Sequence, residues 1–168
     1  MKKFLSCFLV ACGIFTTQVL LKANADAEAA KDIPTLALTS VNKNVDYPIP
    51  KLLEVVQISP NQIQVTYDRD VDMNLGKKPT NYWIQSTKND KPKGIATLGK
   101  NDKVNKDNSL TDKNVKIESK DNSANTFILT FNDKIKKGEE YKLIICYVTV
   151  KGAPAYNGDN GMGTFIGK

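Results

Sequence analysis

The segment "KIKKGEEYKLIICYVTV", from Lys134 to Val150, decides the fold more than any other part of the sequence. A lysine-rich turn that contains Gly138 leads into Tyr141, and the longest apolar run outside the N-terminal region follows it. A continuous apolar run of this length, directly after a turn, is typical of a strand that is buried on both faces. The segment therefore predicts a turn followed by a central strand.

The regions on either side of this segment repeat the strand pattern. In "QIQVTY", Ile63, Val65 and Tyr67 alternate with polar residues. In "NTFILTF", Phe127, Leu129 and Phe131 alternate with Thr126, Ile128 and Thr130. A glycine-rich stretch near the C-terminus predicts a loop and a short final strand. No helical periodicity is visible after the N-terminal region, which predicts an all-β protein. The other strand candidates are Leu52–Ile58, Gln62–Tyr67, Asn81–Ser86, Asn114–Ser119 and Asn125–Phe131.

Tyr141 gives this all-β pattern a more specific interpretation. In immunoglobulin-like sandwiches, a tyrosine near the start of strand F closes the preceding corner, and in antibody domains a cysteine follows two residues later. Leu143 occupies that place here, and Cys146 lies further along the same strand candidate as an inert packing residue. The pattern predicts an immunoglobulin-like antiparallel β-sandwich of about seven strands, with Tyr141, Leu143 and Cys146 in structural roles.

Both faces of the strand after Tyr141 are apolar, so we expect both to be covered. Alternate residues share a face, and Tyr141 places Leu143, Ile145 and Tyr147 in the core. The opposite set would be an unusual apolar patch on a monomer: Ile144, Cys146, Val148 and Val150. We expect residues 36–41 or the "GIATLG" stretch (94–99) to cover it; failing both, the face would bind a second copy or a surface partner.

Several short motifs, in order, resemble a known family. They are "EVVQISPNQIQVTYDRDVD", "NYWIQS", "NTFILTFNDKIKKGEEYKLIICYVTVKG" and "NGDNG". Together they are similar to the bacterial immunoglobulin-like modules of surface-layer and other cell-wall proteins, the SbsA-type group. The resemblance covers Leu52 to Gly161, and the lysine-rich middle of the chain matches poorly. It implies an exported module with a structural or adhesive role at the bacterial cell surface.

The N-terminal region predicts export. Two lysines, an apolar stretch from Phe4 to Leu21 and small residues around Ala25 are typical of a signal peptide at residues 1–25. The alternative is a lipoprotein cleavage site at "LVAC", although the apolar run continues past Cys12. Residues 26–50 are expected to be a leader with one possible strand at 36–41. Residues 51–168 then form the sandwich, and no membrane span remains after signal removal.

Composition limits the chemistry of the mature chain. The formal charge is +6, and removal of Lys2, Lys3 and Lys22 leaves 21 basic and 18 acidic residues, or +3. This mild charge argues against a nucleic-acid partner. The sequence has no histidine, so Ser-His-Asp and Cys-His catalytic sets are impossible. Cys146 is the one cysteine outside the signal, which excludes an intrachain disulfide. We expect no enzymatic activity.

The polar stretch near residues 87–112 is expected to be an insertion with short edge strands and long turns, or a partly disordered segment. Its lysines belong to a run from Lys88 to Lys120 that also contains five acidic residues. This mixture favours a solvated surface with balanced charge. A polyanionic cell-wall polymer such as teichoic acid is the alternative partner for these lysines.

Three aspartates follow the strand "QIQVTY" at every second position: Asp68, Asp70 and Asp72. Counted from Asp68, an EF-hand loop would need glycine and glutamate where Met73 and Pro79 stand, so that motif is excluded. If the strand continued, the three carboxylates would share a face and could hold calcium, the one cofactor that the sequence suggests. The alternative that we favour is a strand end, with Val71 tucked under the sandwich and the other side chains solvating the turn.

Two further sets of residues are candidate binding positions. The stretch "YNGDNGMGTFIG" contains G-x-G but lacks the strand-to-helix context of a phosphate loop, and Asp159 and Asn160 within it could help to hold a metal. The alternative to a structural or adhesive module is a carbohydrate- or wall-polymer-binding module. Its stacking residues would be Tyr82, Trp83 and Tyr156.

Overall fold

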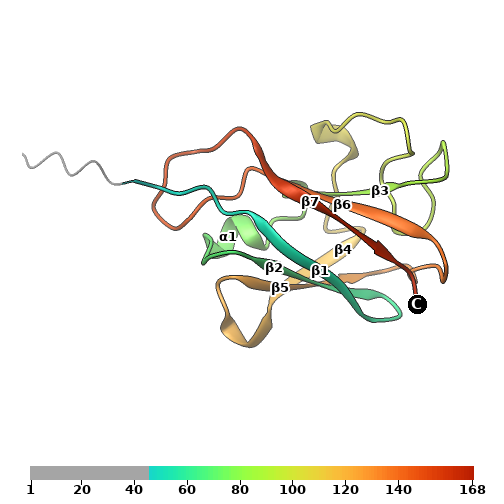
Figure 1. The fold of residues 1–168 in the computed structure, drawn as a ribbon, viewed down its shortest axis with the longest axis horizontal. Coiled ribbons are helices and arrows are strands. Elements are labelled where there is room, and N and C mark those ends of the chain that lie inside the picture. The colour runs from blue at the N-terminus through green and yellow to red at the C-terminus, as the bar shows by residue number, and fades with distance from the viewer. Residues whose placement is uncertain (1–45) are drawn as a thin grey trace, which may run out of the picture. The chain divides into compact units, whose positions relative to one another are not determined.

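The computed structural model describes residues 46–168, and these residues form a β-sandwich (Figure 1). The expected signal peptide and the strand expected at residues 36–41 lie outside the described residues. Within residues 46–168, no helix is long and apolar enough to cross a membrane. The fold is built from seven strands in two antiparallel sheets, which confirms the predicted all-β sandwich.

Four strands form one sheet and three form the other. The larger sheet has the order β1 (Leu52–Ser59), β2 (Gln62–Tyr67), β5 (Thr126–Phe131) and β4 (Val115–Ser119). The smaller sheet has the order β3 (Tyr82–Ser86), β6 (Glu140–Cys146) and β7 (Asp159–Ile166). This order, A-B-E-D against C-F-G, is that of constant-type immunoglobulin domains. Short helical turns lie between strands: α1 (Met73–Gly76) and three 3₁₀ turns, Pro79–Asn81, Lys106–Asn108 and Lys120–Asn122.

The core lies between the sheets and comes from the alternation seen in the sequence. In β2 and β5 one alternating set, which is apolar, is buried, and the other set, which is polar except for Ile128, is partly exposed, as expected for strands with one face on the core. The pairing register places Val65 opposite Phe127 and Ile63 opposite Leu129, so that matching apolar residues meet across the strands. The buried residues of these two strands are Ile63, Val65, Tyr67, Phe127, Leu129 and Phe131.

Strand β6 follows the prediction for most of its length and departs from it at Tyr147. Leu143 and Ile145 point into the core as expected. The strand ends at Cys146 because Tyr147 has a positive φ of 69°, a conformation that interrupts the strand. This residue shifts the alternation by one position, so Val148 enters the core and Tyr147 is exposed. The expected core position of Tyr147 was therefore wrong.

Leu98 of the "GIATLG" stretch covers Ile144 and Cys146 on the outer face of β6, which confirms the predicted cover for these two residues, whereas Val148, expected on the same face, lies in the core. Leu98 packs with Trp83, Ile144 and Cys146 in a small buried cluster. The same stretch closes the free edge of β3, because the N–H of Leu98 donates to Ile84 O (3.0 Å) and Leu98 O accepts from the N–H of Ser86 (2.9 Å). An exposed edge strand invites unwanted pairing, and this segment removes that edge.

Tyr141 lies at the start of β6, directly after the lysine-rich turn, as the sequence predicts. Tyr141 is buried and its ring stacks on Phe165 of β7, with ring centroids 5.6 Å apart. Burial raises the pKa of the Tyr141 hydroxyl. Leu143 is fully buried where antibody domains carry a cysteine, so packing replaces the disulfide at this place.

Candidate functional site

The carboxylates of Asp68 and Asp72, two of the three aspartates after β2, have separate hydrogen-bond partners. Asp68 accepts hydrogen bonds from the N–H of Lys51 (2.8 Å) and from the guanidinium of Arg69 (2.8 and 3.1 Å). The Arg69 guanidinium holds the pKa of the Asp68 carboxyl below its usual value. Asp72 caps α1 through two backbone N–H groups, at 2.9 and 3.2 Å. Asp70 lines a surface pocket of about 440 Å³, which Asp72 also lines.

The arrangement agrees with the end of a strand. Val71 is buried in the core, as that interpretation expects. Among the described residues, no three acidic, cysteine or histidine side chains lie close enough together to hold a metal ion. Calcium binding by Asp68, Asp70 and Asp72 stays a prediction, and a rise in melting temperature with millimolar calcium would support it.

Tyr82 and Trp83 lie inside the protein, so their predicted role as stacking residues needs correction. Both side chains are fully buried, and a buried ring has no free face for a sugar. The Tyr82 hydroxyl donates to Gly76 O (2.5 Å) and lies 2.8 Å from the Tyr67 hydroxyl. Trp83 Nε1 donates to Asn105 O (2.9 Å). Both residues are core residues that also hold neighbouring loops in place.

A groove beside the β6–β7 loop brings two other aromatic side chains together. Tyr147 and Tyr156 line this groove, which has a volume of about 470 Å³, together with the polar side chains of Lys78 and Asn157. Tyr147 is 37 % exposed, and its ring meets Trp83 edge-on with centroids 6.1 Å apart. The groove therefore offers aromatic faces beside hydrogen-bonding groups, a combination that suits a polar polymer with apolar faces.

The strain at Tyr147 could not be foreseen from the sequence. A bulky residue with positive φ is uncommon and costs about 1–3 kcal/mol. The conformation turns the ring out of the core and into the groove that Tyr156 also lines. The sequence pattern instead placed Tyr147 in the core, because an unbroken apolar run gives no sign of a backbone irregularity.

Cys146 lies in an apolar cluster with Leu98 and Trp83. Burial raises the pKa of the Cys146 thiol, with a smaller contribution from the charge of Asp159. A raised pKa keeps the sulfur in its thiol form at neutral pH, and the thiol is a poor nucleophile. These surroundings agree with the predicted structural role.

Asn160 is a buried polar residue whose importance the sequence pattern did not predict. Its side chain is fully buried, donates to Pro50 O (2.9 Å) and Val148 O (2.7 Å), and accepts from the N–H of Val148 (2.9 Å). All its bonds are to backbone groups, so it is a structural link and its side chain is not free to bind a metal. Its only signal in the sequence is the turn-like dipeptide with Gly161.

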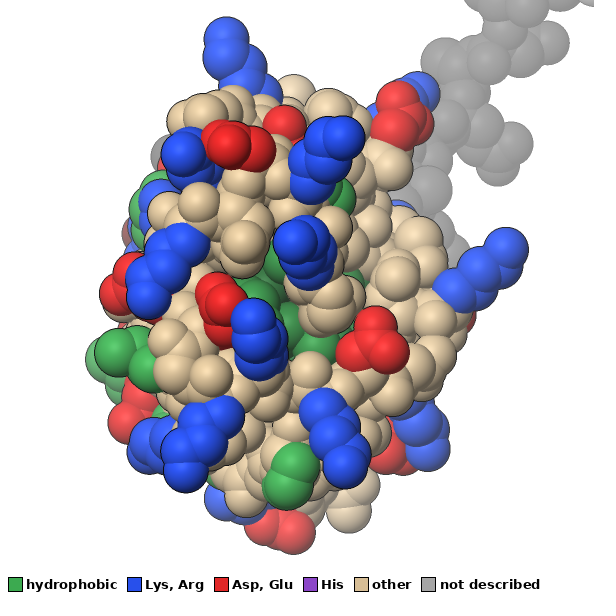
Figure 2. All heavy atoms as spheres, turned by 90° about the vertical axis from the view of Figure 1, so that its right-hand side faces the viewer, with side chains coloured by type: hydrophobic (Ala, Val, Ile, Leu, Met, Phe, Trp, Pro, Cys, Tyr) green, Lys and Arg blue, Asp and Glu red, His purple; other side chains and the backbone are tan. Residues whose placement is uncertain are grey.

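The lysine-rich face carries charges of both signs. Figure 2 shows the right-hand end of the view in Figure 1, with Lys and Arg side chains spread around a small hollow and Asp and Glu side chains among them. Two small pockets, of about 90 and 50 Å³, meet at Gly94, and both are lined by lysines and acids as well as by apolar side chains. The mixture agrees with the predicted solvated surface.

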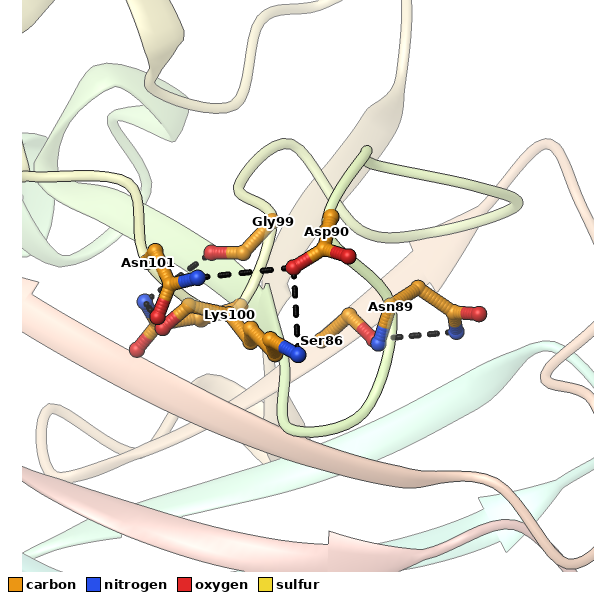
Figure 3. Close-up of polar contacts among 7 residues, drawn as sticks. Ser86, Asn89, Asp90, Gly99, Lys100 and Asn101 are labelled. Atoms are coloured by element: carbon orange, nitrogen blue, oxygen red, sulfur yellow. Dashed lines mark hydrogen bonds and ion pairs between the residues drawn. The ribbon is translucent and has the colours of Figure 1, made fainter.

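The insertion near residues 87–112 has defined polar contacts (Figure 3). Lys100 Nζ lies 3.1 Å from Asp90 Oδ1, and the N–H of Asn89 donates to Ser86 Oγ (3.0 Å). The two N–H groups of Gln85 Nε2 are shared among three carbonyl oxygens of the insertion, at 3.1–3.2 Å. Of the two expectations for this segment, the structure favours an edge segment with long turns.

Comparison with known proteins gives matches among solved structures. No family model matches this sequence, and no curated protein sequence matches it significantly. The crystal structure of the N-terminal part of the bacterial S-layer protein SbsC is similar, with a TM-score of 0.50 at 16 % identity, over 71 % of this chain and 23 % of that chain. SbsC domains 1–6 and rSbsC(31-844) each give 0.48 at 16 % identity, over 71 % of this chain and 14 % of theirs.

The likeness to the N-terminal part of SbsC concerns the fold. This chain spans less than a quarter of each SbsC chain that it matches, so the shared region is a small part of those proteins. At this low identity the likeness shows a similar fold over the matched part of the chain.

Proposed function

We propose that this chain is an exported, non-enzymatic immunoglobulin-like module with a structural or adhesive role at a bacterial cell surface. The observation that carries the proposal is the seven-stranded sandwich, which resembles part of the bacterial S-layer protein SbsC. The signal-like start of the sequence and its lack of histidine agree with it. Assignment to the SbsA-type group belongs to the same proposal and rests on the sequence motifs. The partner would be a cell-wall polymer or a surface protein.

Fractionation of the native bacterial culture tests this proposal. The protein should be found in the wall or culture-fluid fraction, and mass spectrometry should place the mature N-terminus near Asp26. A lipidated N-terminus at Cys12 would instead support the lipoprotein alternative. Intact chain that retains Met1 and stays in the cytoplasmic fraction would contradict export and, with it, the proposed function.

A second candidate function is binding of a carbohydrate or wall polymer in the groove. The observation that favours it is the exposure of Tyr147 beside Tyr156, with Lys78 and Asn157 in the same groove. The Tyr156 hydroxyl donates to Asp159 O (3.1 Å), which orients the ring. Of the three stacking residues expected from the sequence, Tyr156 alone has this position, and Tyr147 takes the place of the two buried rings.

Retention on purified cell walls and on glycan arrays tests this second candidate. Tyr156→Ala should abolish retention, whereas Tyr156→Phe, which keeps the aromatic face, should preserve most of it. Thermal melts of both variants serve as the control for folding. Equal retention by the wild type and Tyr156→Ala would exclude the groove as the binding site.

A further inference from the structure

We infer that this module carries tension along its length through a clasp between its first and last strands. The terminal clasp consists of the contacts that join residues 50–57 to residues 159–168. The inference rests on the proposed structural role, since a surface module bears force only when both of its ends are attached. Its test uses purified protein, so a negative result there would leave the cellular location untouched.

The two strands of the terminal clasp run parallel. Figure 1 shows β1 and β7 side by side, with the C-terminus at the far end of the domain from the start of β1. From the start of β1 to its end, the partners on β7 move in the same direction along the chain. Three contacts give this direction: Leu52 lies against Gly161, Val55 lies against Gly163, and the N–H of Lys168, just after β7, donates to Gln57 Oε1 (2.8 Å). Two further hydrogen bonds join the residues just before β1 to the start of β7: Asn160 Nδ2 to Pro50 O (2.9 Å) and Lys51 Nζ to Asp159 O (3.1 Å).

Close packing adds to these hydrogen bonds. Gly161 and Gly163 of β7 lie against Leu52 and Val55 of β1. A Cβ atom at Gly163 would lie 2.8 Å from Val55 Cγ1, closer than side chains pack, so glycine is needed for this approach. The glycines that the sequence placed in a loop therefore serve to bring β7 against β1.

The parallel direction decides how the clasp responds to force. Force applied to the chain ends pulls β1 by its N-terminal end and β7 by its C-terminal end. In a parallel pair these ends lie at opposite ends of the contact, so the strands must slide past each other and all the bonds are loaded together. An antiparallel pair would be pulled from one end, and its bonds would break one after another.

The hydrogen bond from Asn160 to Pro50 O is hard to break because of the surroundings of Asn160. It is fully buried and is also bonded to Val148 at the end of β6, so its bond to Pro50 is anchored in the smaller sheet. Buried hydrogen bonds are shielded from competing water, and breaking one exposes unpaired groups. The resistance to force depends on the barrier to unfolding, which such bonds raise when they break in the rate-limiting step.

Single-molecule force spectroscopy in two geometries tests the inference. In the first, the full chain is pulled through its two ends. In the second, it is pulled through its N-terminal end and a peptide tag inserted after Lys151, in the exposed loop before β7, so that the clasp is peeled from one side. We expect the unfolding force to be at least about two-fold higher in the first geometry. Equal forces in the two geometries would overturn the inference.

Variants identify the residues that bear the force. Asn160→Ala should lower the end-to-end unfolding force, and so should the double variant Lys51→Met/Gln57→Ala, which keeps the buried core intact if Asn160→Ala fails to fold. Gln85→Ala is the matched control, because it removes a buried amide with three hydrogen bonds outside the clasp. An end-to-end force unchanged in the double variant, or lowered as much by Gln85→Ala, would show that the clasp bears no load.

Discussion

Gln85 and Asn160 are two buried amides that hold the opposite edges of the three-stranded sheet. Gln85 lies on the edge strand β3 and binds carbonyl groups of the insertion, 14–17 residues further along the chain. Asn160 lies on the other edge strand, β7, and binds Pro50, which is 110 residues away. Each amide therefore attaches a segment without regular secondary structure to an edge that would otherwise be open.

Gln85 and Asn160 differ in how much of the structure each of them holds in place. Gln85 closes a local loop, and the insertion that it holds also has the apolar anchor Leu98. Asn160 joins the two ends of the domain and has both donors and its acceptor buried. Loss of Gln85 should therefore loosen one segment, whereas loss of Asn160 should weaken the whole sandwich. Four variants or conditions test this contrast.

Asn160→Ala should have the largest effect. The substitution leaves Pro50 O and both backbone groups of Val148 without partners in a buried site, and we expect a loss of about 4 kcal/mol in the free energy of unfolding. Urea unfolding followed by circular dichroism measures it. Asn160→Asp keeps only the acceptor and should be nearly as unstable. A loss below about 1 kcal/mol for Asn160→Ala would mean that water replaces the amide at little cost.

Leu98→Ala should rank second. Leu98 is fully buried against Trp83, Ile144 and Cys146, and truncation of such a leucine costs about 3 kcal/mol. We also expect the outer face of β6 to become accessible, with increased reactivity of the Cys146 thiol toward a thiol reagent. Exposed Val104→Ala in the same insertion is the control. Unchanged thiol reactivity in folded Leu98→Ala would show that another segment covers this face.

Gln85→Ala should have a smaller and more local effect. Its three acceptor carbonyls belong to a surface insertion and can turn toward water, so the expected loss is about 2 kcal/mol. Hydrogen exchange should accelerate in residues 87–105, while the amides of β2 and β5 stay protected. Accelerated exchange throughout both sheets would erase the difference between the two edges.

The strands were predictable because their burial pattern is local. In β2, apolar and polar residues alternate over all six positions, and β5 keeps this alternation except at Ile128, so the pattern is visible without knowledge of any neighbour. The cover over β6 was predictable for a related reason: a strand with two apolar faces requires one, and "GIATLG" is an apolar island in a polar stretch.

The amides and the groove were not predictable, because each depends on contacts between distant positions. Asn160 is polar and stands among glycines, which indicates a loop, and only the approach of Pro50 and Val148 makes it a buried link. Trp83 was expected at a binding surface, but Leu98 of the insertion packs over it. Nothing in the sequence of its own strand indicates that this insertion covers it. Tyr147 stands at the end of an apolar run, which predicts a core position. Its positive φ turns its side chain toward the surface instead.

Acid should produce the smallest effect, and it tests a second anchor of the segment that Asn160 holds. Asp68 accepts from the N–H of Lys51, directly after Pro50, and its pKa is lowered first of all by Arg69. A lowered pKa in the folded state means that the contribution of Asp68 is complete above its unfolded pKa of about 3.9 and disappears as the pH falls through the folded value. The Arg69 and Asp68 side chains are 39 % and 28 % exposed, so solvent limits this contribution to below about 1 kcal/mol.

Urea unfolding of the wild type and Asp68→Asn at several pH values measures this contribution. At neutral pH the wild type should be slightly more stable, and the gap should narrow as the pH falls below the unfolded pKa and through the lowered folded pKa of Asp68, because protonation removes the charge that Asn lacks. Asn160→Ala should differ from the wild type by a nearly constant amount over the same range, since an amide does not titrate there. A gap between the wild type and Asp68→Asn that persists in acid would assign the role of Asp68 to packing, leaving Asn160 as the polar anchor of the first strand.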